Sequence, residues 1–239
     1  MPVNLKLPRM VDGALDALLP SHCLLCGARG QGALSLCDAC EAEMPRNDVC
    51  CARCALPLET PAQLCGRCIK HAPPWDEAWA PFRYEWPLAQ LESRFKFGGD
   101  LAAGRTLALL WCASPRTVAL PEVVVPVPLH RSRLRLRGYN QVLELAGTLA
   151  RHFGVRLRRE ALLRDRATDA QTELSAVQRR RNVRGAFSAQ FGDEIPQHVA
   201  VLDDVCTTGA TLAECARALK RAGVARVDAW ALARAPARG

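Results

Sequence analysis

VLDDVCTTGAT, residues 201–211, is the stretch of sequence that decides the fold. It continues an apolar run, His198–Asp203, of the kind that forms a buried parallel strand. Two adjacent carboxylates, Asp203 and Asp204, close the run, and a short Thr/Gly loop then leads into a helical pattern over Thr211–Ala222. The stretch therefore predicts a strand, a tight loop and a helix whose N-terminus faces the carboxyl end of the strand.

A strand-to-helix junction of this kind predicts an anion site. Unpaired backbone N–H groups and the positive end of the helix attract a phosphate, and Gly209 permits close approach of the backbone. The two carboxylates lie on the strand side of the same crevice, where they can accept hydrogen bonds from vicinal sugar hydroxyls. The alternative is a simple helix cap, which needs only one acid and one hydroxyl. Because the string exceeds that requirement, we favour the phosphate site.

The pattern around this junction predicts an α/β domain. Further buried strands are expected at Glu122–Val127 and Ala225–Leu232, and a helix at about Tyr139–Phe153. Helical periodicity also covers 87–96 and 101–112. Alternation of strands and helices predicts a parallel sheet, flanked by helices, with right-handed crossovers.

Twelve cysteines are present, and eight of them form a repeat. From Cys23 to Cys51 is 28 residues, and the same step relates each cysteine of the first copy to one of the second. Each copy reads C-x2-C-x10-C-x2-C, which is the spacing of a tetrahedral zinc site. The predicted ligands are Cys23, Cys26, Cys37, Cys40, Cys51, Cys54, Cys65 and Cys68.

We interpret these cysteines as the ligands of two structural Zn²⁺ ions. Reduced buried thiols and iron–sulfur ligation are the alternatives, and zinc-ribbon spacing favours zinc over both. The spacing leaves open whether ligands pair within or across the two copies, and whether Cys50 replaces Cys51. Cys112, Cys206 and Cys215 stand in apolar surroundings and are expected to be ordinary packed thiols.

Composition and charge restrict the partners. The chain has 239 residues, a formal net charge of +8 and a pI near 9.1, which favours a nucleic acid or a phosphorylated ligand. Residues 1–20 carry charges among apolar positions, so we expect a helical lead-in and neither a secretory signal nor a transmembrane segment. Paired cysteines without an export signal indicate metal ligation in a reducing cytoplasm, and we expect a cytoplasmic protein.

A Pro-rich and aromatic segment, residues 71–86, predicts an extended connection. Its rings are Trp75, Trp79, Phe82, Tyr84 and Trp86. They suit either a platform that stacks the bases of a single-stranded nucleic acid or the packing of a metal module onto the larger domain. We favour packing.

Arginine is concentrated in one part of the chain. Fourteen arginines and five acids lie between Arg131 and Arg184, without a lysine. Guanidinium groups bind phosphate oxygens in a bidentate manner, so this stretch suits a pyrophosphate or a nucleic-acid backbone. For Arg156, Arg158 and Arg159 a solvated charged face is the favoured interpretation.

The loop 203–211 resembles the ribose-phosphate fingerprint of type I phosphoribosyltransferases. The resemblance implies that Asp203 and Asp204 are the catalytic acids and hold the ribose hydroxyls of phosphoribosyl pyrophosphate, which binds with Mg²⁺. It implies that the following loop wraps the 5′-phosphate. The loop residues are Val205, Cys206, Thr207, Thr208, Gly209, Ala210 and Thr211. Thr207 stands where relatives that act on 6-oxopurines have an aspartate, so the resemblance does not extend to a 6-oxopurine substrate.

Four more segments make the resemblance specific for the ComF (competence protein F) family. They are Pro126–His130, Arg137–Gln141, the pattern of Thr168, Gln171 and Leu174, and Arg179–Arg184 followed by Ala186-Phe187. The resemblance implies a double zinc ribbon, a phosphoribosyltransferase-like domain, and a role in natural transformation and DNA uptake. By analogy with related transferases, it also implies a pyrophosphate and cover region. That region comprises His130, Arg131, Arg137, Gly138, Asn140, Gln141, Arg180 and Arg184.

The expected organisation is a lead-in at 1–20, a double zinc ribbon at 21–70, a linker at 71–86 and the phosphoribosyltransferase-like domain at 87–239. Two functions agree with it. One is Mg²⁺-dependent phosphoribosyl transfer to an acceptor that the sequence does not identify. The other is a non-catalytic accessory that handles single-stranded DNA, cooperates with competence or DNA-processing proteins, and is regulated by a phosphoribosyl ligand.

Overall fold

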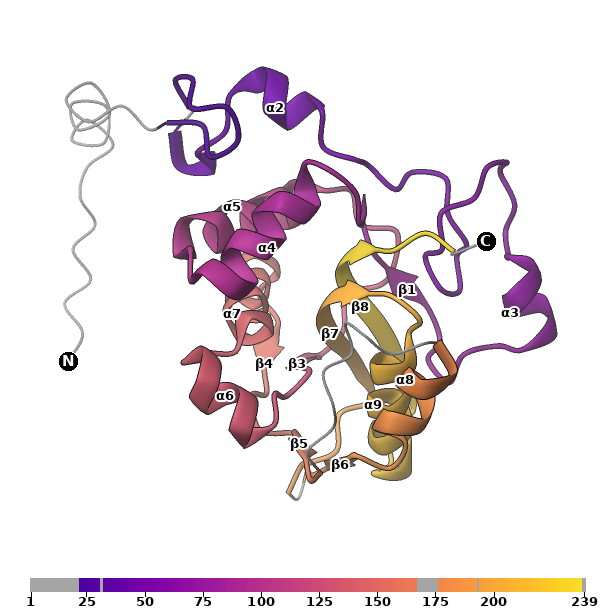
Figure 1. The fold of residues 1–239 in the computed structure, drawn as a ribbon. Helices are drawn as coiled ribbons and strands as arrows, with labels where there is room; N and C mark the ends of the chain where they lie inside the picture. Colours follow the sequence, from indigo (N-terminus) through magenta and orange to yellow (C-terminus); the bar gives the residue numbers. More distant parts are fainter. Residues whose placement is uncertain (1–21, 31, 167–175, 193, 238–239) are drawn as a thin grey trace.

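A parallel sheet forms the centre of the computed structural model, which describes residues 22–30, 32–166, 176–192 and 194–237 (Figure 1). The strand order is β1-β8-β7-β3-β4, β2 also pairs with β8, and every pair in this sheet is parallel. The strands are β1 (Ala78–Trp79), β2 (Phe82–Arg83), β3 (Val123–Pro126), β4 (Arg156–Leu157), β7 (His198–Cys206) and β8 (Arg226–Arg234).

The predicted strands are confirmed, and β7 and β8 both continue beyond their predicted ends. All of β3 is buried, as a β-branched run between two helix layers requires. The pairing of β7 with β8 continues from His198↔Arg226 to Cys206↔Arg234, so β7 runs past Asp203 to Cys206. Asp204 therefore lies within the strand, and the loop proper begins at Thr207.

Helices cover both faces of the sheet. The long ones are α4 (Leu88–Gly98), α5 (Leu101–Ala113), α7 (Gln141–Phe153) and α9 (Ala210–Arg221). The crossover β3-α7-β4 and the crossover β7-α9-β8 proceed in opposite directions along the sheet, so right-handed connections place α7 and α9 on opposite faces (Figure 1). Among the helices described, none combines the length and apolarity that crossing a bilayer requires.

Several short elements in the arginine-rich part were not predicted. They are α6 (Arg131–Arg137), β5 (Leu162–Arg164), α8 (Ala176–Val183) and β6 (Phe187–Ala189), with β5 and β6 antiparallel. Arginines occupy positions where periodicity would need apolar residues, so no amphipathic signal marks α6 or α8. The motif of Thr168, Gln171 and Leu174 and the lead-in 1–20 lie outside the described residues.

The aromatic segment joins the sheet through β1 and β2, and its rings pack inside. Trp79 contacts Trp111 and Trp230, with ring centroids 5.8 and 5.0 Å apart. Trp75 and Phe82 are also buried, whereas Trp86 is 65% exposed. Rings held in the core cannot stack on bases, which supports the packing interpretation over the nucleic-acid platform.

Candidate functional site

A cleft of about 1870 Å³ lies beside the carboxyl ends of β3 and β7, at the N-terminus of α9. In open parallel sheets this edge is the usual place for ligands. Four acids, Glu92, Asp203, Asp204 and Glu214, line the cleft. Ten lysines and arginines line it as well, and a cleft with this balance concentrates anions. The ten are Arg67, Lys96, Arg133, Arg137, Arg164, Arg181, Arg184, Arg217, Arg221 and Arg234.

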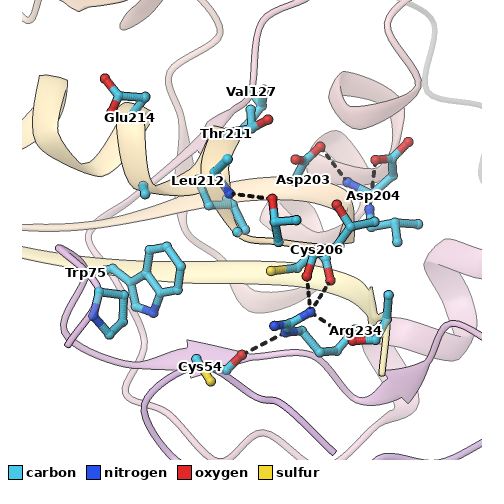
Figure 2. A pocket seen from close by; sticks show the side chains of 18 of the residues that line it. Cys54, Trp75, Val127, Asp203, Asp204, Cys206, Thr211, Leu212, Glu214 and Arg234 are labelled. Carbon is cyan, nitrogen blue, oxygen red and sulfur yellow. Dashed lines mark hydrogen bonds between the residues drawn. The ribbon is translucent and has the colours of Figure 1, made fainter. Parts of the chain in front are cut away.

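The predicted phosphate loop joins β7 to α9 along this cleft (Figure 2). Gly209 caps the helix in the left-handed region, with φ 74°. The Thr208 hydroxyl accepts a hydrogen bond from the Ala210 amide at 3.3 Å. A first helical turn carries more N–H groups than one side chain satisfies, so the loop is suited to an anion as well as to a cap.

Gly209 is required for a reason that the sequence did not suggest. A Cβ at this position would lie 2.8 Å from Cη2 of Trp75. The positive φ also disfavours any other residue. This glycine therefore also permits close approach of the loop to the Trp75 ring, which packs behind it.

Asp204 is held by a network of donors. Its Oδ2 accepts from Gln141 Nε2 at 2.9 Å and pairs with Lys96 Nζ at 2.9 Å. Its Oδ1 accepts from the amide of Val205 at 2.7 Å. Only 7% of the side chain is exposed. The carboxylate is therefore fixed in orientation before any ligand arrives.

Lys96 and Glu92 are functional candidates that sequence reasoning missed. They stand four residues apart on α4, and Lys96 Nζ lies 3.1 Å from Glu92 Oε1. Glu92 is 1% exposed and also accepts a hydrogen bond from the Tyr84 hydroxyl at 3.1 Å. The i,i+4 spacing was visible in the sequence, but nothing in it indicated that Asp204, more than a hundred residues later, shares the ammonium group.

The two adjacent acids have opposite pKa shifts. Burial raises the pKa of Asp203 well above its ordinary value, and repulsion from Asp204 adds to the effect. Burial also opposes ionisation of Asp204, but the charge of Lys96 and the hydrogen bond from Gln141 outweigh it and hold that pKa below its ordinary value. Lys96, despite burial, has a raised pKa because Asp204 and Glu92 favour its charged form. Asp204 therefore stays ionised, while Asp203 is the proton-sensitive member.

Only part of the predicted cover region lies at the cleft. Arg137, Gln141 and Arg184 line it, and Arg137 Nη1 donates to Gln141 Oε1 at 2.6 Å. The remaining described residues shape helices: His130 caps the start of α6, Gly138 ends it with φ 81°, and Asn140 caps α7. Arg131 is exposed in the first turn of α6, and the Arg180 side chain lies outside the described residues.

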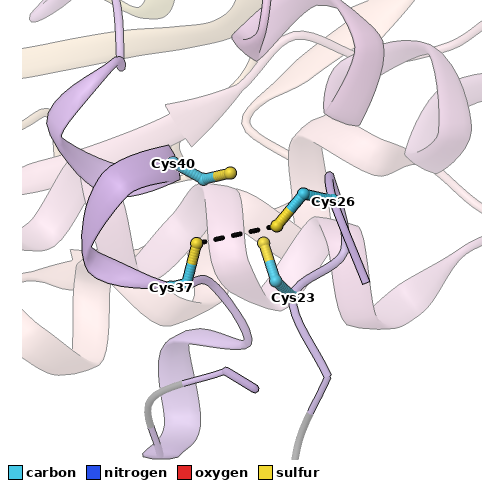
Figure 3. A group of neighbouring side chains, drawn as sticks. All are labelled: Cys23, Cys26, Cys37 and Cys40. Carbon is cyan, nitrogen blue, oxygen red and sulfur yellow. Dashed lines mark hydrogen bonds between the residues drawn. The ribbon is translucent and has the colours of Figure 1, made fainter. Parts of the chain in front are cut away.

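The first zinc site consists of Cys23, Cys26, Cys37 and Cys40 (Figure 3). Their Sγ atoms all lie within 4.8 Å of one another, and Cys26 and Cys37 are 3.7 Å apart. A tetrahedral ion with Zn–S bonds of about 2.3 Å needs sulfur atoms roughly 3.8 Å apart, so this arrangement fits Zn²⁺.

The second site consists of Cys51, Cys54, Cys65 and Cys68, so ligands pair within each copy. Cys54 and Cys65 Sγ are 3.7 Å apart. Burial opposes ionisation of Cys51, but the backbone amides of Cys65 and Cys54 lower its pKa to about 7. Burial raises the pKa of Cys68 to about 12, so four thiolates need a cation to coexist. Cys50 does not belong to the cluster, and Cys51 is the ligand.

The two copies pack against different parts of the α/β domain. Leu24 O and Leu34 O of the first copy accept hydrogen bonds from Arg94 on α4 and Thr106 on α5. In the second copy, Arg53 O accepts from Trp75 and Cys54 O accepts from Arg234. The first copy therefore lies beside α4 and α5 (Figure 1), and the second is connected to the phosphate loop through Arg234.

The fold and the two clusters define an α/β protein whose parallel sheet is flanked by helices and which carries a double zinc ribbon. Residues 14–69 match the family model of the Double zinc ribbon domain. The chain is 39% identical over 208 residues to Competence protein F of Haemophilus influenzae, covering 84% of this chain and 90% of that protein. It is 35% identical over 223 residues to DNA utilization protein YhgH of Escherichia coli, covering 90% and 98%. The chain belongs to the ComF family.

More distant similarities extend beyond these relatives. Competence protein ComFC of Streptococcus pneumoniae is 27% identical over 231 residues, which cover 89% of this chain and 99% of that protein. Among solved structures, glutamine phosphoribosylpyrophosphate amidotransferase of B. subtilis, complexed with ADP and GMP, aligns with a TM-score of 0.36. That alignment has 20% sequence identity and covers 53% of this chain and 25% of that protein.

Proposed function

We propose that the cleft binds phosphoribosyl pyrophosphate. The observation that carries the proposal is the junction of β7 and α9, where Asp203 and Asp204 are followed by a helix-initiating loop inside an arginine-lined cleft. The loop offers donors for a 5′-phosphate, the acids offer acceptors for ribose hydroxyls, and the arginines offer forked donors for a pyrophosphate. One ligand with these three groups satisfies all three parts of the cleft.

The acids have different roles in this proposal. Asp204, already ionised and oriented by Lys96 and Gln141, accepts from a ribose hydroxyl with its remaining lone pair. Asp203 forms no ion pair within the described part of the chain, and burial together with the charge of Asp204 raises its pKa, so a cation beside it would favour its charged form. A Mg²⁺ ion that arrives with the pyrophosphate prefers oxygen ligands and fits this carboxylate. Such an ion would neutralise charge on the pyrophosphate.

We propose that this arrangement supports phosphoribosyl transfer. The bond from C1 of the ribose to pyrophosphate breaks, pyrophosphate leaves with the electron pair, and the acceptor bonds to C1 and loses a proton. The arginines on the cleft wall stabilise the leaving pyrophosphate, and the loop and acids hold the ribose in place. Positioning and electrostatics are sufficient, so no protein nucleophile is needed.

The relatives support an association with DNA uptake. Two of them are named for competence and one for DNA utilization. We therefore propose that this chain acts in the same process, with competence or DNA-processing proteins as partners. The arginines exposed near the cleft, such as Arg181 and Arg184, keep single-stranded DNA as a second proposed ligand. A soluble ligand such as phosphoribosyl pyrophosphate agrees with our expectation of a cytoplasmic location.

Calorimetry with phosphoribosyl pyrophosphate and Mg²⁺ tests the ligand. Ribose 5-phosphate and pyrophosphate, each alone, serve as controls because each satisfies only part of the cleft. We expect the complete ligand to bind more tightly than either fragment. Equal affinity for pyrophosphate alone would reduce the site to a general anion-binding surface. A screen for pyrophosphate release over free bases and DNA then separates turnover from binding.

A further inference from the structure

The underside of the phosphate loop is joined to the second zinc site by one buried arginine. Arg234, at the end of β8, is 5% exposed. Its Nη1 donates to Cys206 O at 2.7 Å and to Thr207 O, and its Nε donates to Cys54 O at 3.1 Å (Figure 2). One guanidinium group therefore connects the backbone of a zinc ligand with the backbone of the loop.

These contacts also determine which way the loop amides point. In a planar trans peptide the N–H is directed opposite to the C=O. Because the carbonyls of Cys206 and Thr207 face Arg234, the amides of Thr207 and Thr208 point away from the buried guanidinium group. Arg234 thus leaves those N–H groups on the side of the loop where an anion can reach them.

A second connection runs through Trp75. Its Nε1 donates to Arg53 O, between two zinc ligands, at 2.7 Å, and the side chain is 4% exposed. The same ring lies behind Gly209, with its Cη2 only 2.8 Å from the position that a Cβ would occupy. Trp75 itself is held at the sheet edge, because the neighbouring Asp76 exchanges hydrogen bonds with Val227. Arg234 and Trp75, both hydrogen-bonded to the second zinc module, therefore contact the loop near both of its ends.

We propose that the second zinc site, acting through Arg234 and Trp75, holds the phosphate loop in its anion-binding conformation. Both residues are positioning residues. The four thiolates of Cys51, Cys54, Cys65 and Cys68 would bind the ion, which fixes the turn carrying the Arg53 and Cys54 carbonyls. Among the described residues the first zinc site shows no such connection, since the carbonyls of Leu24 and Leu34 accept from α4 and α5. The consequence for phosphoribosyl pyrophosphate rests on the proposed function, whereas the ordering of the loop does not.

Hydrogen exchange of the full chain without ligand tests the ordering. We compare Cys54→Ser with the matched Cys26→Ser, each of which removes one ligand from one site. Cys54→Ser is expected to speed exchange in peptides covering 205–211 about tenfold or more, the factor that corresponds to about 1.4 kcal/mol. Cys26→Ser is expected to speed exchange in 88–104 and leave 205–211 unchanged. Equal effects of both variants on the loop, or none from Cys54→Ser, would overturn the proposal.

Arg234→Met and Trp75→Leu test the connections without touching a zinc ligand, in case Cys54→Ser does not fold. Both variants should keep two zinc ions while exchange in 205–211 rises relative to the central strands. A uniform rise across the sheet would indicate a merely structural role and refute the positioning claim. Calorimetry adds the ligand arm, in which Arg234→Met is expected to weaken phosphoribosyl pyrophosphate at least about tenfold. If the wild type binds none while the exchange pattern appears, the proposed function fails and the positioning proposal stands.

Discussion

Replacing Lys96 with methionine tests the electrostatic network beneath the acid pair. Methionine keeps much of the length of the side chain and removes the charge, which leaves Asp204 and Glu92 buried without their shared ammonium group. Removing one partner of a buried ion pair costs about 3–5 kcal/mol. Because 24% of the Lys96 side chain is exposed, we expect a loss near the lower figure, about 3 kcal/mol at pH 8.

The cost should depend on pH in a definite direction. In the wild type the pKa of Asp204 is lowered, so its contribution to stability is present above the ordinary pKa and lost only as pH falls through the depressed value. Without Lys96, burial and mutual repulsion should raise the pKa of both Asp204 and Glu92 in the folded state. As pH falls from about 8 to about 6, the folded variant then takes up protons that the unfolded chain does not. The stability gap to the wild type should therefore shrink.

Urea unfolding followed by tryptophan fluorescence measures the gap at both pH values. Lys220→Met is the matched control, because Lys220 pairs with Asp76 at 2.9 Å while both side chains are about one-third exposed. Such a pair is worth at most about 1 kcal/mol. Adding Glu92→Gln to Lys96→Met should recover part of the loss, since one orphaned carboxylate is gone. The reasoning is refuted if Lys96→Met costs no more than Lys220→Met, or if its cost is the same at both pH values.

Three further outcomes are expected. Elemental analysis should find two zinc ions per chain, falling to one in both Cys26→Ser and Cys54→Ser; iron in their place would contradict the assignment. Asp203→Asn should weaken binding of phosphoribosyl pyrophosphate by about 1.5–3 kcal/mol in calorimetry with little change in melting temperature. Asp204→Asn should lower both the affinity and the melting temperature. A lower melting temperature for Asp203→Asn than for Asp204→Asn would contradict their assigned roles. Single-stranded DNA should bind at low salt in filter-binding assays and weaken steeply as salt rises, and substitution of Arg179, Arg180 and Arg181 should reduce it; absence of binding at low salt would remove this ligand.

The sequence was sufficient wherever a local pattern has one physical meaning. Buried apolar runs predicted β3, β7 and β8 because a strand covered on both faces has no polar alternation. The cysteine spacing predicted tetrahedral clusters because two turns of fixed length bring four sulfur atoms together. Pairing within each copy needed the structure, since equal spacing permits either arrangement.

Long-range contacts through the backbone were not predictable. Arg234 donates to the carbonyls of Cys54 and Cys206, and any residue at those positions would offer the same acceptor. Lys96 reads as a surface lysine at the end of a helix until the fold places Asp204 beside it. The two cysteine copies have identical spacing, yet they pack against different parts of the domain because their partners, Arg94 and Arg234, lie in unrelated elements.

The different environments of the adjacent acids follow from strand geometry. Neighbouring side chains on a strand point to opposite faces, so Asp203 and Asp204 at the end of β7 cannot share one environment. Asp204 points toward α4 and α7, where Lys96 and Gln141 hold it. Strand alternation directs Asp203 to the opposite face of the sheet, which is the face that α9 covers. Both acids line the cleft, so we expect Asp203 to meet a ligand without a competing partner, and Asp204 to meet it while also securing the strand end through Lys96 and Gln141.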